Sequence, residues 1–189
     1  SMAEGDIFIS NSNSYPHNDR NYLIIFSGSG ELKYFKKLKR SASDFKVNEN
    51  GLLSYISVIN NSNDIAAFIM DSTFTTIDSF QVTDPYVTDG HEFLVLENGS
   101  YFLLGKTYRY LDLSQHGGYE SARIQGCIIQ EFNSENVLIF EWNSFDYFNY
   151  EDNTHIPLTL PFIDYVHANS IDIDNDGNII LSSRHLCEI

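Results

Sequence analysis

The sequence predicts an all-β chain made of β-propeller blades, each built from four antiparallel strands. Glycines that open an apolar strand recur every 46 to 48 residues, and repeats of this length with four short strands are typical of propellers. No segment of the 189 residues shows a convincing helical apolar period. The recurring glycines are Gly5, Gly51, Gly99 and Gly177, and the last interval is one period plus about 30 residues.

The strands on either side of these glycines repeat as well. An apolar side chain stands six residues before the glycine, as Phe45, Phe93 and Ile171. Two outer strands then follow in each unit, and glycine, asparagine and serine fill the gaps between them, as turns require. The predicted pairs of outer strands are 22–27 with 31–38, 65–71 with 75–82, and 122–132 with 136–142.

These strands divide residues 4–189 into a partial propeller domain, preceded by residues 1–3, which are typical of a cloning remnant. The 13 predicted strands make about three blades, too few for a closed ring of four to eight. We expect a portion of a longer protein, or else copies that associate through open blade edges. The blade units cover about 4–40, 41–83, 88–142 and an incomplete 166–189, with an inserted loop at 143–165.

Composition excludes several classes of partner. With 26 acidic and 11 basic residues, the net charge of −15 argues against nucleic acid or an anionic membrane surface. No apolar run is long enough to span a membrane. The basic cluster within 33–40 is predicted to be a solvated strand edge. Cys127 and Cys187 form neither a disulfide framework nor a zinc motif, and we expect both to be buried.

The segment 167–184 is the most informative stretch, because it predicts a hairpin with a polar cluster at its open end. Residues 175–178 supply turn chemistry between two strand-like runs. A two-residue or four-residue loop at this turn pairs residue 169 with residue 184. Side chains alternate across strands, so His167, Asn169 and Arg184 are predicted to share one face.

His91 is predicted to approach His167, because each opens an inner strand and inner strands of successive blades line the central channel. With Arg184 beside them, these donors suit a tetrahedral anion such as a sulfate or phosphate ester, or a carboxylate. Two other interpretations stay open: the histidines bond the neighbouring backbone, or Arg184 pairs with Glu92 or Asp172. Carboxylates at ligand spacing are lacking, so no metal is expected.

The pattern Asp172-x-Asp174-x-Asp176-Gly177 matches the first half of an EF-hand calcium loop. The twelfth position would be Ser183 in place of the bidentate glutamate, and strands rather than helices flank the motif. Hairpin turn chemistry therefore explains these aspartates.

The inserted loop at 143–165 is aromatic and acidic and leads directly into the polar cluster. It is either a wall of a binding site or a surface flap over a blade face. Together with Asn169, Tyr165 at its end is a candidate substrate contact.

The residues of the hairpin also carry a family resemblance. The pattern HxNSxxxDxDGNxxxSxR at 167–184, with Gly-His-Glu-Phe-x-x-x-x-Asn-Gly at 90–99, resembles the arylsulfotransferase family of bacterial β-propellers. The opening Glu4-Gly-Asp-Ile-Phe-Ile-Ser is similar to the start of that domain. The resemblance implies a six-bladed ring that moves a sulfuryl group between phenols, with an aryl sulfate or phenol as partner, no cofactor and an extracytoplasmic location.

The resemblance also implies roles for individual residues. His167 and Arg184 match the family's pair that binds the sulfuryl group, and His91 matches a histidine of an earlier blade. The family's nucleophilic histidine forms a sulfohistidine and lies in a later blade, beyond Ile189. The segment is thus expected to supply the binding side of the site and to be inactive alone.

Two alternative functions come from other classes. The chain could be a non-catalytic propeller module that binds a glycan, a peptide or a partner protein through the aromatic loop, where Tyr147, Phe148, Tyr150 and Tyr165 lie. It could also be a purely structural segment that completes a larger scaffold.

Overall fold

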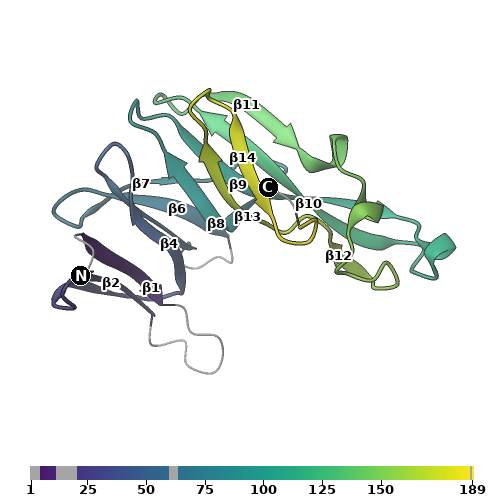
Figure 1. The fold of residues 1–189 in the computed structure, drawn as a ribbon, viewed down its shortest axis with the longest axis horizontal. Coiled ribbons are helices and arrows are strands. Elements are labelled where there is room, and N and C mark those ends of the chain that lie inside the picture. Colours follow the sequence, from purple (N-terminus) through teal and green to yellow (C-terminus); the bar gives the residue numbers. More distant parts are fainter. Residues whose placement is uncertain (1–4, 12–20, 60–63, 188) are drawn as a thin grey trace. The chain divides into compact units, whose positions relative to one another are not determined.

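A computed structural model describes residues 5–11, 21–59, 64–187 and 189 (Figure 1). The chain is all-β with antiparallel sheets, as the sequence predicts. It divides into two compact units, Ser1–Gln81 with Val95–Asn98, and Val82–Leu94 with Gly99–Ile189. No helix within the described ranges is long and apolar enough to cross a membrane. The predicted remnant at residues 1–3 lies outside the described residues.

In the described part of the first unit, two antiparallel sheets follow chain order. The first sheet holds β1 (Asp6–Asn11), β2 (Asn21–Ser27) and β3 (Leu32–Leu38), and the second holds β4 (Ala42–Val47), β5 (Leu53–Val58), β6 (Ile65–Met70) and β7 (Thr76–Phe80). Leu23 and Ile25 of β2 join Phe45 of β4 and Tyr55 of β5 in one buried cluster. The lysine-rich β3 is a sheet edge, as expected.

The second unit holds the sheet β11-β10-β9-β8 and the separate hairpin β13-β14. Its strands are β8 (Val87–Val95), β9 (Tyr101–Leu111), β10 (Ala122–Phe132), β11 (Leu138–Asn143), β12 (Phe162–Asp164), β13 (Ala168–Ile173) and β14 (Ile179–Ser183). The strand β12 was not predicted. It lies in the inserted segment and pairs with β10 in parallel (Figure 1).

The described part of the second unit also contains short 3-10 helices. They are η1 (Ser114–His116), η2 (Ser144–Asp146) and η3 (Tyr150–Asp152). Both η2 and η3 begin after an asparagine whose side chain accepts a backbone N–H two residues on, which is ordinary capping by asparagine. The inserted segment is therefore folded into turns and one strand.

Five hairpin turns among the described residues share one backbone geometry: 27–31, 48–52, 71–75, 133–137 and 174–178. In each, the first residue donates its N–H to the fifth carbonyl, and the fourth residue donates to the first carbonyl. The fourth residue has a positive φ in every case, as in Gly51 (79°) and Gly177 (82°). This is the three-residue loop closed by a G1 bulge, and glycine favours the left-handed position.

The bulge explains why the predicted register of the last hairpin was wrong by one residue. Ile171 lies opposite Leu181, not opposite residue 182. A second register shift between Ala168 and Ser170 removes Asn169 from the ladder. As a result His185 is buried and Arg184 is exposed, the reverse of the predicted facing.

The predicted repeat of apolar residues is confirmed. Phe45, Phe93 and Ile171 are 6%, 0% and 4% exposed. They occupy the same position in three successive units of the sequence, six residues before a glycine with positive φ. The period of the sequence therefore reports a repeated core contact and a repeated turn.

Candidate functional site

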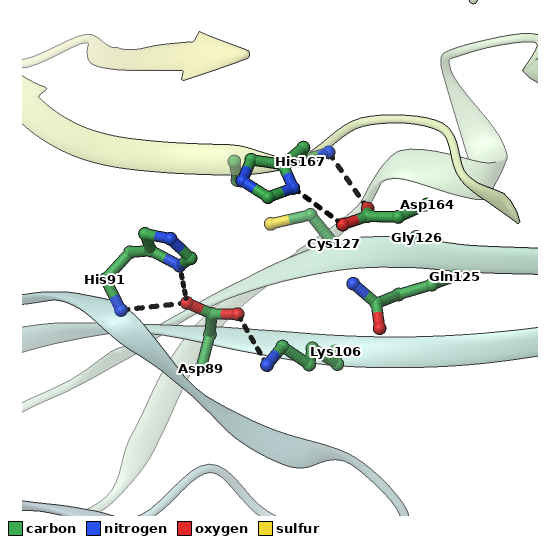
Figure 2. Close-up of a pocket in the computed structure, with 9 residues that line it drawn as sticks. Asp89, His91, Lys106, Gln125, Gly126, Cys127, Asp164 and His167 are labelled. Atoms are coloured by element: carbon green, nitrogen blue, oxygen red, sulfur yellow. Dashed lines mark hydrogen bonds and ion pairs between the residues drawn. The ribbon is translucent and has the colours of Figure 1, made fainter. Parts of the chain in front are cut away.

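A small polar pocket in the second unit contains both histidines that the sequence singles out (Figure 2). Its cavity of about 80 Å³ is lined by β8, β9 and β10 together with the chain from Asp164 to Ala168. A cavity of this size holds several waters, so it has room for a small polyatomic anion.

Strand register places the side chains that line this pocket. Lys106 of β9 lies opposite Cys127 of β10, and Gln125 of β10 lies opposite Asp164 of β12. The parallel strand β12 therefore carries the inserted segment into the pocket. This favours the first interpretation of that segment, as a wall of a site.

Asp89, His91 and Lys106 form one hydrogen-bonded cluster on β8 and β9 (Figure 2). Asp89 Oδ1 accepts the backbone N–H of His91 at 2.8 Å and lies 2.5 Å from His91 Nδ1. Lys106 Nζ lies 3.1 Å from Asp89 Oδ2. The bond to Asp89 raises the pKa of His91 although burial opposes this. Burial acts against ionisation of Asp89, but the bond from His91 and the charge of Lys106 lower its pKa.

Asp164 holds His167 in the same way. Its Oδ2 lies 2.8 Å from His167 Nδ1, and its Oδ1 accepts the backbone N–H of His167 at 3.1 Å. His167 has a φ of 47°, in the left-handed region that non-glycine residues seldom adopt. Such a conformation persists only where surrounding contacts fix it, and the two bonds to Asp164 supply them.

The prediction that the two imidazoles approach each other is confirmed. The ring centroids of His91 and His167 are 5.4 Å apart and meet edge to face. Each ring is bonded through Nδ1 to an aspartate, which leaves Nε2 available to a ligand (Figure 2). The arrangement presents two fixed imidazoles and one ammonium group to the cavity.

The structure places the other predicted site residues elsewhere. Arg184 is exposed and is not one of the residues that line the pocket, because the bulges described above shift the strand. Asn169 lies at the second register shift and also does not line the pocket. Tyr165 is fully buried, and its hydroxyl donates to Ser144 Oγ at 2.9 Å. A buried ring does not offer a surface to a substrate, so the position of Tyr165 gives its predicted contact no support.

Sequence reasoning missed the residues that complete the pocket, namely Asp89, Lys106 and Asp164. A signal for the aspartates was present, since an aspartate precedes His91 by two residues and His167 by three. At such short spacing a carboxylate can bond both the backbone N–H and the ring of the histidine. Lys106 carries no local signal, because only strand pairing brings it to Asp89.

His185 was also assigned no role, and the structure brings it close to His167. Their ring centroids are 4.6 Å apart, and His185 Nδ1 lies 2.5 Å from the backbone oxygen of Asp164. One ligand atom from each of Asp164, His167 and His185 lies within 4.8 Å of the others. The expectation that carboxylates at ligand spacing are lacking was therefore wrong. The aspartates of the turn at 174–178 instead bond their own loop, as expected.

Cys127 is an inert wall of the pocket. Burial, with the nearby charges of Asp89 and Asp164, raises the pKa of its thiol far above the usual range, so it stays protonated. Its neighbour Gly126 has to be glycine, because an added Cβ would lie 2.6 Å from Ser144 Oγ. Cys187 differs from the expectation, since it is exposed.

Comparison with known proteins gives one family. The family model described as Arylsulfotransferase (ASST) matches residues 2–189. The match covers nearly the whole chain and agrees with the resemblance seen in the hairpin pattern. No curated protein matches the chain.

Proposed function

The chain belongs to the arylsulfotransferase (ASST) family, and from this premise we propose that it supplies the sulfuryl-binding side of a site that transfers a sulfuryl group between phenolic compounds. The observation that carries the proposal is the pair His91 and His167, whose rings are 5.4 Å apart and each fixed through Nδ1 by an aspartate. Fixed donors aimed at one small cavity are what a charged tetrahedral group requires.

The charges of the pocket suit this role. With both imidazoles protonated, the three cationic groups of His91, His167 and Lys106 exceed the two carboxylates of Asp89 and Asp164. The carboxylates do not compete for the ligand, since they already accept from Nδ1 and from Lys106 Nζ. Their effect is to orient the donors before the sulfuryl group arrives, which lowers the cost of ordering them.

The reaction proceeds in two displacements. A histidine ring nitrogen attacks sulfur, an N–S bond forms, and the S–O bond to the donor breaks, with the electron pair leaving on the phenolate, which then takes a proton. The acceptor phenol then loses its proton and attacks the same sulfur, which breaks the N–S bond and restores the imidazole. Covalent relay splits one difficult transfer into two easier ones. That a later part of the protein supplies this histidine remains a prediction.

In this scheme His91, His167 and Lys106 hold the sulfuryl oxygens, which carry charge through both steps. The cavity of about 80 Å³ takes the sulfuryl group, and the aryl ring lies outside it. Participation of Arg184 and Asn169 remains a prediction. So does the extracytoplasmic location that the sequence resemblance implies.

The test has two arms. In the first, the complete encoded protein is assayed for sulfuryl transfer from 4-nitrophenyl sulfate to phenol, followed by release of 4-nitrophenol. In the second, sulfate binding to this chain is measured by calorimetry, and we expect His167→Ala to weaken it at least about tenfold, the loss of one charge-assisted hydrogen bond. His116→Ala is the matched control, since His116 pairs with Glu151 away from the pocket.

Absence of transfer together with unchanged sulfate binding in His167→Ala would falsify the proposal. Equal weakening by His116→Ala would show that the loss is a general effect of removing a histidine and would overturn the assignment of this pocket.

A second candidate function keeps the site non-catalytic and gives ligand capture to the inserted segment. It is favoured by the stack of Trp142 on Tyr147, whose ring centroids are 5.6 Å apart with Tyr147 70% exposed. Exposed aromatic platforms bind sugars and peptides through apolar contact. This function predicts that Tyr147→Ala abolishes capture of a glycan in an array screen while His167→Ala does not.

A further inference from the structure

We propose that Asp164, His167 and His185 form a binding site for a divalent transition-metal ion of the zinc class. The three residues come from β12 and the two ends of the hairpin, and all lie in the second unit. One ligand atom from each lies within 4.8 Å of the others. The proposal is independent of sulfuryl transfer, although His167 belongs to both sets of residues.

The spacing is close to that of an assembled site. Zinc binds nitrogen and oxygen at about 2.0 to 2.2 Å, so neighbouring ligand atoms of a tetrahedral site stand about 3.3 to 3.5 Å apart. Asp164 Oδ2 and His167 Nδ1 are 2.8 Å apart, and the ring of His185 is 4.6 Å from that of His167 between centroids. Small rotations of three side chains therefore bring the ligand atoms onto one ion.

The chemistry of the set selects the class of ion. Two imidazoles and one carboxylate are the ligands of zinc and its neighbours, whereas calcium and magnesium require oxygen ligands. Three protein ligands leave a fourth position of a tetrahedral site for water or a small anion. The ion replaces the hydrogen bond between Asp164 Oδ2 and His167 Nδ1.

The ligands are held by the fold, which limits the entropy lost on binding. His185 is 9% exposed and donates its backbone N–H to Val166 at 3.2 Å. Asp164 is fixed by the pairing of β12 with β10, opposite Gln125. His167 is fixed by its backbone N–H, which donates to Asp164 Oδ1 at 3.1 Å. Preorganised ligands of this kind bind an ion without refolding of the site.

A competing nitrogen and sulfur pair lies close by and must be separated from this site. His155 Nε2 is 2.9 Å from Cys187 Sγ, and the rings of His155 and His185 are 6.0 Å apart between centroids. A thiolate is a strong zinc ligand, so this pair of His155 and Cys187 is a competing place for the ion. The variants below distinguish the two locations.

Metal binding is measured on the chelator-treated chain in a buffer free of phosphate and sulfate. Calorimetry with Zn²⁺ is expected to give one site per chain, and the visible spectrum with Co²⁺ is expected to show tetrahedral coordination. His185→Gln and Asp164→Asn should each weaken Zn²⁺ binding at least about tenfold. The matched control is His116→Gln, which removes a histidine that pairs with the carboxylate of Glu151 and is not one of the three proposed ligands. Circular dichroism confirms that each variant is folded.

Unchanged Zn²⁺ affinity in the two ligand variants would overturn the proposal. Loss of binding in Cys187→Ser but not in His185→Gln would also overturn it and would place the ion at the His155 pair. Sulfate binding is measured on His185→Gln in parallel. Loss of zinc binding with sulfate binding intact supports the metal site, and failure of either measurement leaves the other proposal standing.

Discussion

The β4–β7 sheet and the β8–β11 sheet share a design, but only the second carries the pocket with His91 and His167. Each has four antiparallel strands in chain order, a buried phenylalanine in its first strand (Phe45 or Phe93) and a left-handed glycine after that strand (Gly51 or Gly99). In the sequence repeat, the positions of Asp89, His91 and Lys106 correspond to Ser41, Ser43 and Val58 in the earlier unit. The scaffold is repeated while the charged cluster is not.

The difference shows that the repeated four-stranded unit accepts either uncharged or charged side chains at these positions. In the first unit, Ser57 Oγ donates to the backbone carbonyl of Ser41 at 2.8 Å, just before β4 begins. In the second unit the corresponding residues bond through side chains and face a cavity. The fold and the pocket thus depend on different residues of one repeat, and substitutions can separate them.

The largest expected effect tests the shared scaffold. Phe93→Ala and Phe45→Ala should each cost about 3 to 5 kcal/mol of unfolding free energy, because both rings are buried. The single tryptophan, Trp142, lies in the second unit and reports the Phe93 variant by fluorescence in urea. Hydrogen exchange of β4 and β5 reports the Phe45 variant. If either variant lowered the unfolding free energy by less than about 1 kcal/mol, the two phenylalanines would not play the same part in the cores of the two sheets.

The next effect concerns packing that only the second sheet has. Gly126→Ala should cost about 1 to 3 kcal/mol, because the new methyl group would overlap Ser144 Oγ and the Phe145 ring. Urea unfolding followed by Trp142 fluorescence measures it. Ser79→Ala in the first unit is the control, because Ser79 is exposed and its bond to Asp78 uses only the backbone N–H. Followed by hydrogen exchange of β6, it should change stability by about 0.5 kcal/mol or less. If Gly126→Ala and the control variant lowered stability equally, the close packing at Gly126 would not distinguish the second sheet from the first.

A smaller effect tests the charged cluster itself. Asp89→Asn removes the carboxylate that raises the pKa of His91, so this pKa should fall toward its ordinary value. Proton NMR titration of the imidazole measures it. Sulfate binding near neutral pH should weaken roughly tenfold, since less of His91 is protonated. If the pKa of His91 stays raised, Asp89 does not hold the ring.

The smallest effect is the pH dependence of stability in the second unit. The pKa of His91 is raised above 6.5, so its contribution to stability is complete below pH 6.5 and is lost as pH rises through the raised value. The pKa of Asp89 is lowered below 3.8, so its contribution is lost as pH falls through the lowered value. The urea midpoint of unfolding, measured by Trp142 fluorescence, should be highest between these two pKa values. It should decline as the pH rises through the pKa of His91 and as the pH falls through the pKa of Asp89. An Asp89→Asn, His91→Gln double variant should show a smaller decline on both sides, and the part that comes from Asp112 and Asp174 at low pH should remain.

Much of the fold was predictable because its signals are local. A glycine that follows an apolar strand marks a turn wherever it occurs, and Gly51, Gly99 and Gly177 all have the positive φ that such turns need. The buried positions of Phe45, Phe93 and Ile171 followed from the same period. The approach of His91 to His167 followed from the expectation that inner strands of successive blades are neighbours. The expectation that each histidine opens its strand was wrong for His91, which lies in the middle of β8.

The sequence by itself determined the all-β repeat, its turns, its core phenylalanines and the two histidines of the pocket, since each depends on residues a few positions apart. Only the tertiary structure decided which neighbours complete the site. One left-handed residue in the last turn shifts the ladder by one position and exchanges the facing of Arg184 and His185. Lys106 reaches the pocket through the pairing of neighbouring strands, and no local pattern encodes such a contact.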